Sequence, residues 1–189
     1  MEAFLVATGI VALAEMGDKT QLLSLVLAAR FRKPWPIVLG IFVATVVNHA
    51  LAGAVGAWVT RMLGPDVLRW ILGVSFIAMA AWMMIPDKLD EDDTPRTSRF
   101  GVFGTTLIAF FLAEMGDKTQ IATVMLAARF TQDYVPVVIG TTLGMMLANA
   151  PVVWLGERIV RKVPIRAVHG VSAVIFLVLG VAALAGWGA

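Results

Sequence analysis

The sequence predicts an all-α integral membrane protein, with six transmembrane helices arranged as a 3+3 inverted repeat. Three observations support this fold class: an apolar composition, six apolar stretches of membrane-spanning length, and a nine-residue motif that occurs twice. Hydrophobic residues make up 59% of the 189 residues and charged residues 15%, against about 45–50% and about 25% in soluble domains. The chain contains no cysteine, which excludes a disulfide scaffold, a thiolate metal site and a cysteine nucleophile.

Six stretches are long enough to cross a hydrocarbon core of about 30 Å, which takes about 20 apolar residues. We expect them at about residues 2–29, 35–59, 67–86, 101–128, 134–156 and 167–187. The first and fourth are longer than an untilted helix needs, and each contains a glycine within the repeated motif. We therefore expect both of these helices to be interrupted at the motif.

The expected organisation is a first three-helix repeat at 1–86, an acidic linker at 87–100 and a second three-helix repeat at 101–189. Residues 3–14 resemble the apolar core of a signal peptide. However, the chain begins with Glu2 instead of a basic region, and the apparent cleavage zone recurs at 112–114, so we expect this segment to be retained.

Basic residues outside the motifs are distributed unevenly between the two expected membrane sides. One side holds Arg61, Arg69 and Arg129, and the other holds Arg30, Arg32, Lys33, Lys88, Arg96, Arg99, Arg158, Arg161, Lys162 and Arg166. The positive-inside rule then predicts a cytoplasmic linker, with both termini on the opposite side. The basic residues lie in short loops, so we expect no nucleic-acid partner.

The motif LAEMGDKTQ occupies residues 13–21 and again residues 112–120, and 14 of 19 positions are identical between 13–31 and 112–130. Each half contains three spans, an odd number, so the second half is expected to enter the membrane in the opposite orientation to the first. Inverted repeats of this kind are typical of transporters, whose sites lie near the midplane at the repeat interface. The two motifs are therefore predicted to meet there.

Each motif carries two carboxylates and one ammonium group, so the two together carry a formal charge of −2, which matches one divalent cation. Oxygen donors of this kind suit Mg²⁺, Ca²⁺ or Mn²⁺. The predicted donors are Glu15, Asp18, Thr20, Gln21, Glu114, Asp117, Thr119 and Gln120. When the metal leaves, mutual repulsion favours protonation of the clustered carboxylates, and this predicts metal–proton exchange through one set of side chains.

The alternative is that these charges form buried ion pairs between the first and fourth spans. Ionisable residues within a membrane are costly to insert and are functional candidates by default, and two identical copies favour function further. For Lys19 and Lys118, a proton-coupled or charge-compensating role and a purely structural pair both stay open.

Two further sets of residues are secondary candidates. His49 and Asn149 occupy corresponding positions in the two halves, where they could be metal ligands or, for His49, a proton relay; interhelical hydrogen bonding is the alternative. Met16 and Met115 could supply thioether ligands that favour Mn²⁺ over Ca²⁺, although methionine in an apolar helix more often serves packing.

The doubled motif, Glu15-Met16-Gly17-Asp18-Lys19-Thr20 and Glu114-Met115-Gly116-Asp117-Lys118-Thr119, resembles uncharacterised protein family 0016, and the resemblance extends over the whole chain. That family contains Golgi and thylakoid Ca²⁺/Mn²⁺ transporters and bacterial manganese exporters, proposed to be cation–proton antiporters. The short N-terminus resembles the bacterial members, which implies a multi-pass protein of the bacterial inner membrane.

The resulting hypothesis is a secondary transporter, not an enzyme, that exports Mn²⁺ in exchange for protons by alternating access, with Ca²⁺ as a second candidate ion. We expect no cofactor, and a homodimer is compatible with the sequence. An exporter of amino acids or another cation is the alternative. An intramembrane aspartyl protease fits poorly, because Glu15 stands where its Gly-x-Gly-Asp signature requires glycine.

Overall fold

The structure, a computed structural model, describes residues 1–85, 100–156 and 164–186. The predicted acidic linker lies outside the described residues except for Phe100, as do the predicted cytoplasmic Arg158, Arg161 and Lys162. The described part is all-helical and contains α1 (Glu2–Glu15), α2 (Lys19–Phe31), α3 (Pro34–Met62), α4 (Pro65–Trp82), α5 (Gly101–Glu114), α6 (Lys118–Arg129), α7 (Tyr134–Leu155) and α9 (Ile165–Leu184).

Four of the described helices, α3, α4, α7 and α9, are long and apolar enough to cross a membrane. They correspond to the predicted second, third, fifth and sixth spans. In place of the first span the chain forms two shorter helices, α1 and α2, and in place of the fourth it forms α5 and α6. Both junctions lie within the repeated motif.

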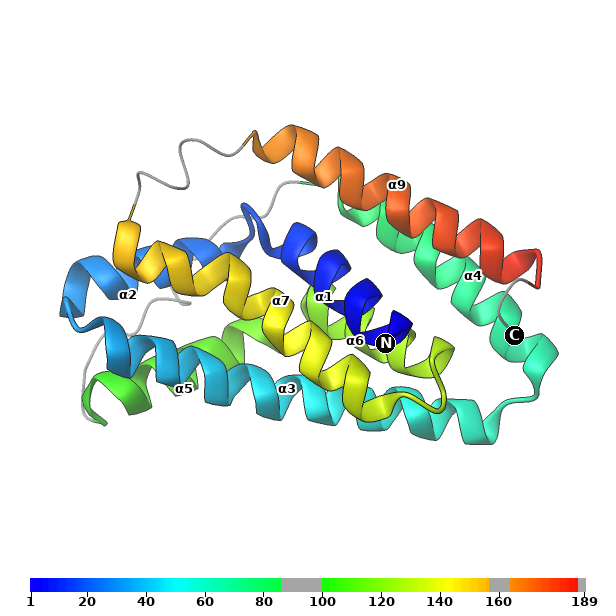
Figure 1. Cartoon of the computed structure of the whole chain (residues 1–189), viewed down its shortest axis with the longest axis horizontal. Coiled ribbons are helices and arrows are strands. Elements are labelled where there is room, and N and C mark those ends of the chain that lie inside the picture. Colours follow the sequence, from blue (N-terminus) through cyan, green and yellow to red (C-terminus); the bar gives the residue numbers. More distant parts are fainter. Residues whose placement is uncertain (86–99, 157–163, 187–189) are drawn as a thin grey trace.

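The helices lie along one common direction, and corresponding elements of the two halves run opposite ways (Figure 1). In that view α1 and α2 run from right to left, whereas α5 and α6 run from left to right. The pairs α3 with α7 and α4 with α9 are likewise opposed. The centre is formed by α3 and α7, which pack on each other: α3 also packs on α5 and α6, and α7 on α1 and α2.

Glycines allow α3 and α7 to approach the interrupted helices closely, at corresponding positions. A Cβ atom on Gly40 of α3 would lie 3.0 Å from the Phe103 carbonyl oxygen of α5, and one on Gly140 of α7 would lie 2.6 Å from the Phe4 carbonyl oxygen of α1. Small residues at such crossings let helix backbones come together in a membrane, where van der Waals packing drives association.

The apolar interior is divided into two clusters of buried side chains. The first contains residues of α1, α4, α6, α7 and α9, with Phe76 and Phe176 among its largest members. The second contains residues of α2, α3, α5 and α7, including Leu23, Ile41 and Phe110. Thus α4 and α9 contribute to the first cluster and not to the second among the described side chains.

The glycine contacts predict opposite effects for two identical substitutions. Gly140→Ala should lower the thermal unfolding temperature in detergent, because the new methyl group would meet the backbone of α1 and overpacking costs about 1–3 kcal/mol. Gly9→Ala, where a Cβ meets nothing within 4 Å, should raise it, because alanine is favoured over glycine in a helix by about 1 kcal/mol. Equal shifts in the two variants would contradict the proposed close packing at Gly140.

Candidate metal site

Both motifs form the same break between two short helices. Helix α1 ends at Glu15 and α2 begins at Lys19, just as α5 ends at Glu114 and α6 begins at Lys118. The turn depends on the motif glycines, because Gly17 has φ +86° and Gly116 has φ +76°. Residues with a Cβ rarely adopt such angles, so the glycine of each motif is explained by the backbone of the break.

The motif glutamines stabilise the breaks. The Gly17 amide donates to the Gln21 Oε1 atom at 3.0 Å, and the Gly116 amide donates to the Gln120 Oε1 atom at 2.7 Å. Gln21 in turn donates through Nε2 to the Ala148 carbonyl oxygen of α7 at 3.1 Å. Both glutamines are predicted metal ligands. In this structure, the side-chain oxygen of each accepts a hydrogen bond from a glycine amide that the helix break leaves without a helical partner.

The acidic residues of each motif occupy opposite kinds of helix end. Glu15 and Glu114 are the last residues of α1 and α5, whereas Asp18 and Asp117 are the N-caps of α2 and α6. The carbonyl end of a helix carries a partial negative charge and the amide end a partial positive charge. A cation is therefore favoured at each glutamate, where a carboxylate and a helix carbonyl end coincide.

The two glutamates are buried, with relative exposures of 0% and 1%, and their surroundings are partly equivalent. Thr20 donates to the Glu15 Oε2 atom and Thr119 to the Glu114 Oε1 atom. Within the described part of the chain, Glu15 Oε1 and Glu114 Oε2 are buried without a hydrogen-bond partner. Each carboxylate thus presents one oxygen that the described protein groups leave unsatisfied.

The neighbouring helices add different groups at the two glutamates. Asn149 of α7 donates through Nδ2 to Glu15 Oε2 at 3.2 Å. At the corresponding place, the His49 Nε2 atom of α3 lies 3.7 Å from Glu114 Oε1, which is beyond hydrogen-bond distance. His49 and Asn149, which correspond in the two repeats, thus both lie beside a motif glutamate. Of the two, only Asn149 forms a hydrogen bond with that glutamate.

The two motifs interact directly. Lys19 of the first motif forms an ion pair with Asp117 of the second, with 3.2 Å between Nζ and Oδ2. Glu15 lies within electrostatic reach of Glu114 and Asp117. These contacts bring residues about a hundred positions apart in the sequence together in one buried group.

The two motif lysines differ in their contacts. The Lys118 Nζ atom donates to the Ile85 carbonyl oxygen after the end of α4 at 3.0 Å and lies 5.9 Å from the centre of the Trp82 ring. Lys118 is buried, whereas the Lys19 side chain is 22% exposed. Identical residues of the two repeats thus occupy different environments.

The described residues contain no group of three or more Asp, Glu and His side chains close enough to hold a metal ion as they stand. One predicted oxygen ligand, Asp117 Oδ2, faces the Lys19 ammonium group. Of the motif methionines, Met115 is 56% exposed, so its thioether does not belong to the buried group of polar side chains.

Three contributors are not among the predicted site residues. Ser24 donates to Asn149 Oδ1 at 2.9 Å, and Met145 lies beside the same Asn149 amide, with 2.9 Å between Sδ and Nδ2. His169 of α9 lies with its Nε2 atom 2.9 Å from the Met16 carbonyl oxygen in the first break. Ser24 lies one helical turn after Thr20, and Met145 lies one turn before Asn149 on α7, so these spacings could have suggested both residues. The contact of His169 comes from a helix far away in the sequence.

Apolar spanning helices around a buried polar group at two helix breaks are typical of a multi-pass membrane transporter. The chain matches the family described as "Divalent cation/proton antiporter GDT1" over residues 3–91 and 102–188. It belongs to this family, and it is accordingly a transporter and not an enzyme.

Related proteins support the same class. A Vibrio cholerae protein named "Putative manganese exporter" is 50% identical over 96% of this chain and 90% of its own length. "GDT1-like protein 3" of Oryza sativa subsp. indica is 28% identical over 93% and 71%, and "GDT1-like protein sll0615" of a Synechocystis strain is 25% identical over 96% of both chains. No solved structure matches this chain.

The ion pair between the motifs predicts an energetic coupling. Lys19→Gln and Asp117→Asn should each lower the thermal stability of the metal-free protein, and the double variant should lose less than the sum, with a coupling of about 0.5–3 kcal/mol. Unfolding in detergent measures all three variants. The matched control is Lys33→Gln, an exposed lysine, whose effect should simply add to that of Asp117→Asn. Strict additivity in the Lys19 cycle would contradict a stabilising ion pair.

Proposed function

We propose that the protein exports Mn²⁺ from the cytoplasm in exchange for protons, with Ca²⁺ as a second substrate, at one site shared by the two motifs. The observation that carries this proposal is the pair of buried glutamates at the carbonyl ends of α1 and α5, each with one oxygen that lacks a hydrogen-bond partner in the described structure. A dication between them would satisfy both oxygens and both helix ends.

The proposed architecture is a 3+3 inverted repeat, with halves at 1–86 and 101–189 and the site near the membrane midplane. The opposed directions of corresponding helices support it (Figure 1), as does the match to the family in two stretches. The equivalent crossings at Gly40 and Gly140 support it further. In this arrangement the two motif breaks approach one site from opposite sides.

The proposed ligands are the motif carboxylates Glu15, Asp18, Glu114 and Asp117, with Thr20, Thr119, Gln21, Gln120 and Asn149 as further oxygen donors. Carboxylate, hydroxyl and amide oxygens suit Mn²⁺ and Ca²⁺. The name of the Vibrio cholerae relative, "Putative manganese exporter", favours manganese among these. The oxygens of Gln21 and Gln120 already accept hydrogen bonds from the glycine amides, so in this proposal each coordinates through its second lone pair.

Lys19 supplies the charge compensation in this proposal. Its ammonium group faces Asp117 Oδ2 in the structure, and a metal ion bound at that oxygen would have to displace it, because two cations cannot share it without strong repulsion. Release of the metal lets Lys19 return and lets protons bind the glutamates. His49 beside Glu114 is the nearest candidate to carry such protons.

The proposed orientation has both termini outside the cytoplasm, in a bacterial inner membrane. In Figure 1 the α3–α4 and α6–α7 connections lie at the end opposite the α2–α3 connection. The α2–α3 connection carries Arg32 and Lys33, so the positive-inside rule assigns that end to the cytoplasm.

The transport proposal predicts loss of Mn²⁺ flux on removal of either glutamate charge. In proteoliposomes, an outward-directed Mn²⁺ gradient should drive counter-movement of protons, and Glu15→Gln or Glu114→Gln should abolish both fluxes. Glu2→Gln, which changes an exposed glutamate at the start of α1, is the matched control and should transport normally. Unchanged Mn²⁺ flux in both motif variants would overturn the proposal.

Exchange at shared carboxylates also predicts a pH dependence. Because protons and metal compete for the same oxygens, Mn²⁺ affinity should fall as the pH falls, and binding should release protons. Calorimetry in buffers of different ionisation enthalpy measures the number released. Glu114→Gln should release fewer protons than the wild type, since one exchanging group is gone. Equal release in both proteins would exclude Glu114 as a proton carrier.

A further inference from the structure

Some residues that are identical in the two repeats differ in burial, and the more buried copy is the one that lies closer to α4 and α9. Ala128 of α6 is 2% exposed, whereas its counterpart Ala29 of α2 is exposed. Met115 is exposed, whereas its counterpart Met16 is half-buried. The identity of these residues cannot cause the differences, because each compared pair is the same amino acid. The cause is that α4 packs on α6 and α9 packs on α1, with no comparable packing of either on α2 or α5.

Helices α4 and α9 are bound closely to each other. Their backbones meet where Gly73 faces Gly180, since a Cβ on either would lie within 3.2 Å of the other's carbonyl oxygen. A Cβ on Gly73 would also lie 2.4 Å from Leu184, and the rings of Phe76 and Phe176 lie 6.2 Å apart. Contacts this close transmit displacement from one helix to the other.

The pair touches the motif breaks at one of its ends, through two polar contacts. Just after the end of α4, the Ile85 carbonyl oxygen accepts a hydrogen bond from the Lys118 ammonium group at 3.0 Å. The start of α9 places the His169 Nε2 atom 2.9 Å from the Met16 carbonyl oxygen. One contact is made to each motif, so the pair is positioned on both halves of the candidate site at once.

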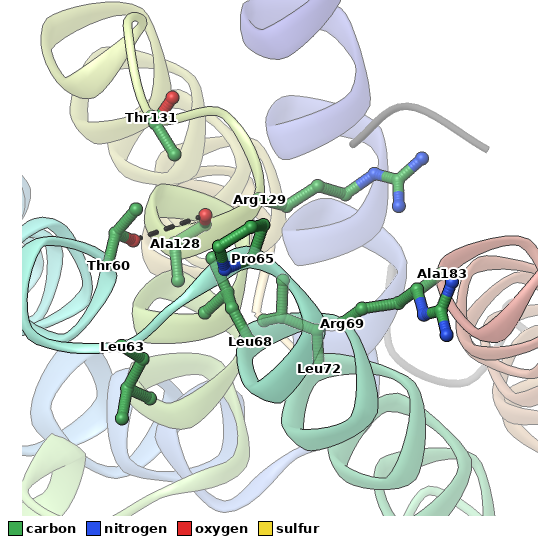
Figure 2. A pocket seen from close by; sticks show the side chains of 10 residues that line it. All are labelled: Thr60, Leu63, Pro65, Leu68, Arg69, Leu72, Ala128, Arg129, Thr131 and Ala183. Carbon is green, nitrogen blue, oxygen red and sulfur yellow. Dashed lines mark hydrogen bonds between the residues drawn. The ribbon is translucent and has the colours of Figure 1, made fainter. Parts of the chain in front are cut away.

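The seam between the pair and the rest of the bundle is incompletely packed. A groove of about 290 Å³ lies there, lined by Thr60 and Leu63 near the end of α3, by α4 residues such as Leu72, and by Ala128 and Arg129 of α6 (Figure 2). The Arg69 Nε atom at this groove is buried and has no hydrogen-bond partner in the described part of the chain. The seam therefore combines a buried apolar cluster with unfilled space, whereas the contact within the pair is close.

We propose that α4 and α9 move as one unit between two packing positions, here called seats. In this structure the pair packs on α1 and α6, and in the other state it packs on α5 and α2. Lys118 and His169 are the positioning residues of the first seat. The inference rests on the opposed directions of the two halves (Figure 1). If corresponding helices of the halves exchange roles, packing of α4 on α6 and of α9 on α1 becomes packing of α9 on α2 and of α4 on α5. In the second state Lys19 takes the place of Lys118 at the moving pair. This rests on the proposed transport function and identifies its moving part.

Cross-linking tests the proposal, because the chain has no native cysteine. The variant Leu72→Cys/Ala128→Cys joins α4 to α6 across the seam, and Gly73→Cys/Leu184→Cys joins α4 to α9 within the pair. A short reagent that links two thiols through a cleavable disulfide should stop Mn²⁺ flux in the first variant and leave it in the second, and a reductant should restore the first. Flux in the linked seam variant, or loss of flux in the linked pair variant, would overturn the proposal. The flux of each linked variant is compared with that of its own unlinked form, and absence of Mn²⁺ flux in the wild-type protein would instead overturn the transport function.

Thiol labelling gives an independent readout of the first seat. His169→Leu removes the contact with Met16, so it should raise the reactivity of Ala128→Cys and lower that of Ala29→Cys, as the pair shifts from α6 towards α2. A merely structural role for His169 predicts that both cysteines become more reactive or that neither changes. Either of those results would contradict the proposed exchange of seats.

Discussion

The main-chain groups released at two helix breaks must find partners inside an apolar bundle, and most of the polar structure depends on this constraint. Water is scarce in a bilayer core, and each unsatisfied main-chain group costs several kcal/mol. Gln21 and Gln120 satisfy the glycine amides, and His169 approaches the Met16 carbonyl oxygen. The conformation of each motif is therefore fixed by groups within it and by contacts from helices that belong to the opposite half.

The same breaks explain why the proposed site would favour cations. A continuous helix would bury its carbonyl groups in its own hydrogen bonds, whereas an interrupted helix ends with a partial negative charge. Glu15 and Glu114 are placed at two such ends, while Asp18 and Asp117 begin the helices that follow. Membership of a divalent cation/proton antiporter family agrees with a site whose buried charges and helix ends favour positive ions.

The sequence predicted the helical membrane class, and the four long helices agree with four of the predicted spans, because apolar length and turn residues are local properties. Duplication of the motif predicted an interaction between its two copies, and the Lys19–Asp117 ion pair is such a contact. Sequence could not predict that Lys118 would contact Ile85 instead, since the two lysines have identical neighbours within the motif. That difference depends on where α4 and α9 pack, a tertiary choice that local patterns do not encode.

Direct location of a bound ion would test whether the two glutamates at helix carbonyl ends share one dication. The measurement is an anomalous diffraction map at the manganese edge, from crystals of the protein grown with Mn²⁺. We expect one strong peak within coordination distance of both Glu15 and Glu114, with Lys19 displaced from Asp117. A peak bound to one motif alone, or a peak elsewhere with the Lys19–Asp117 pair intact, would contradict it.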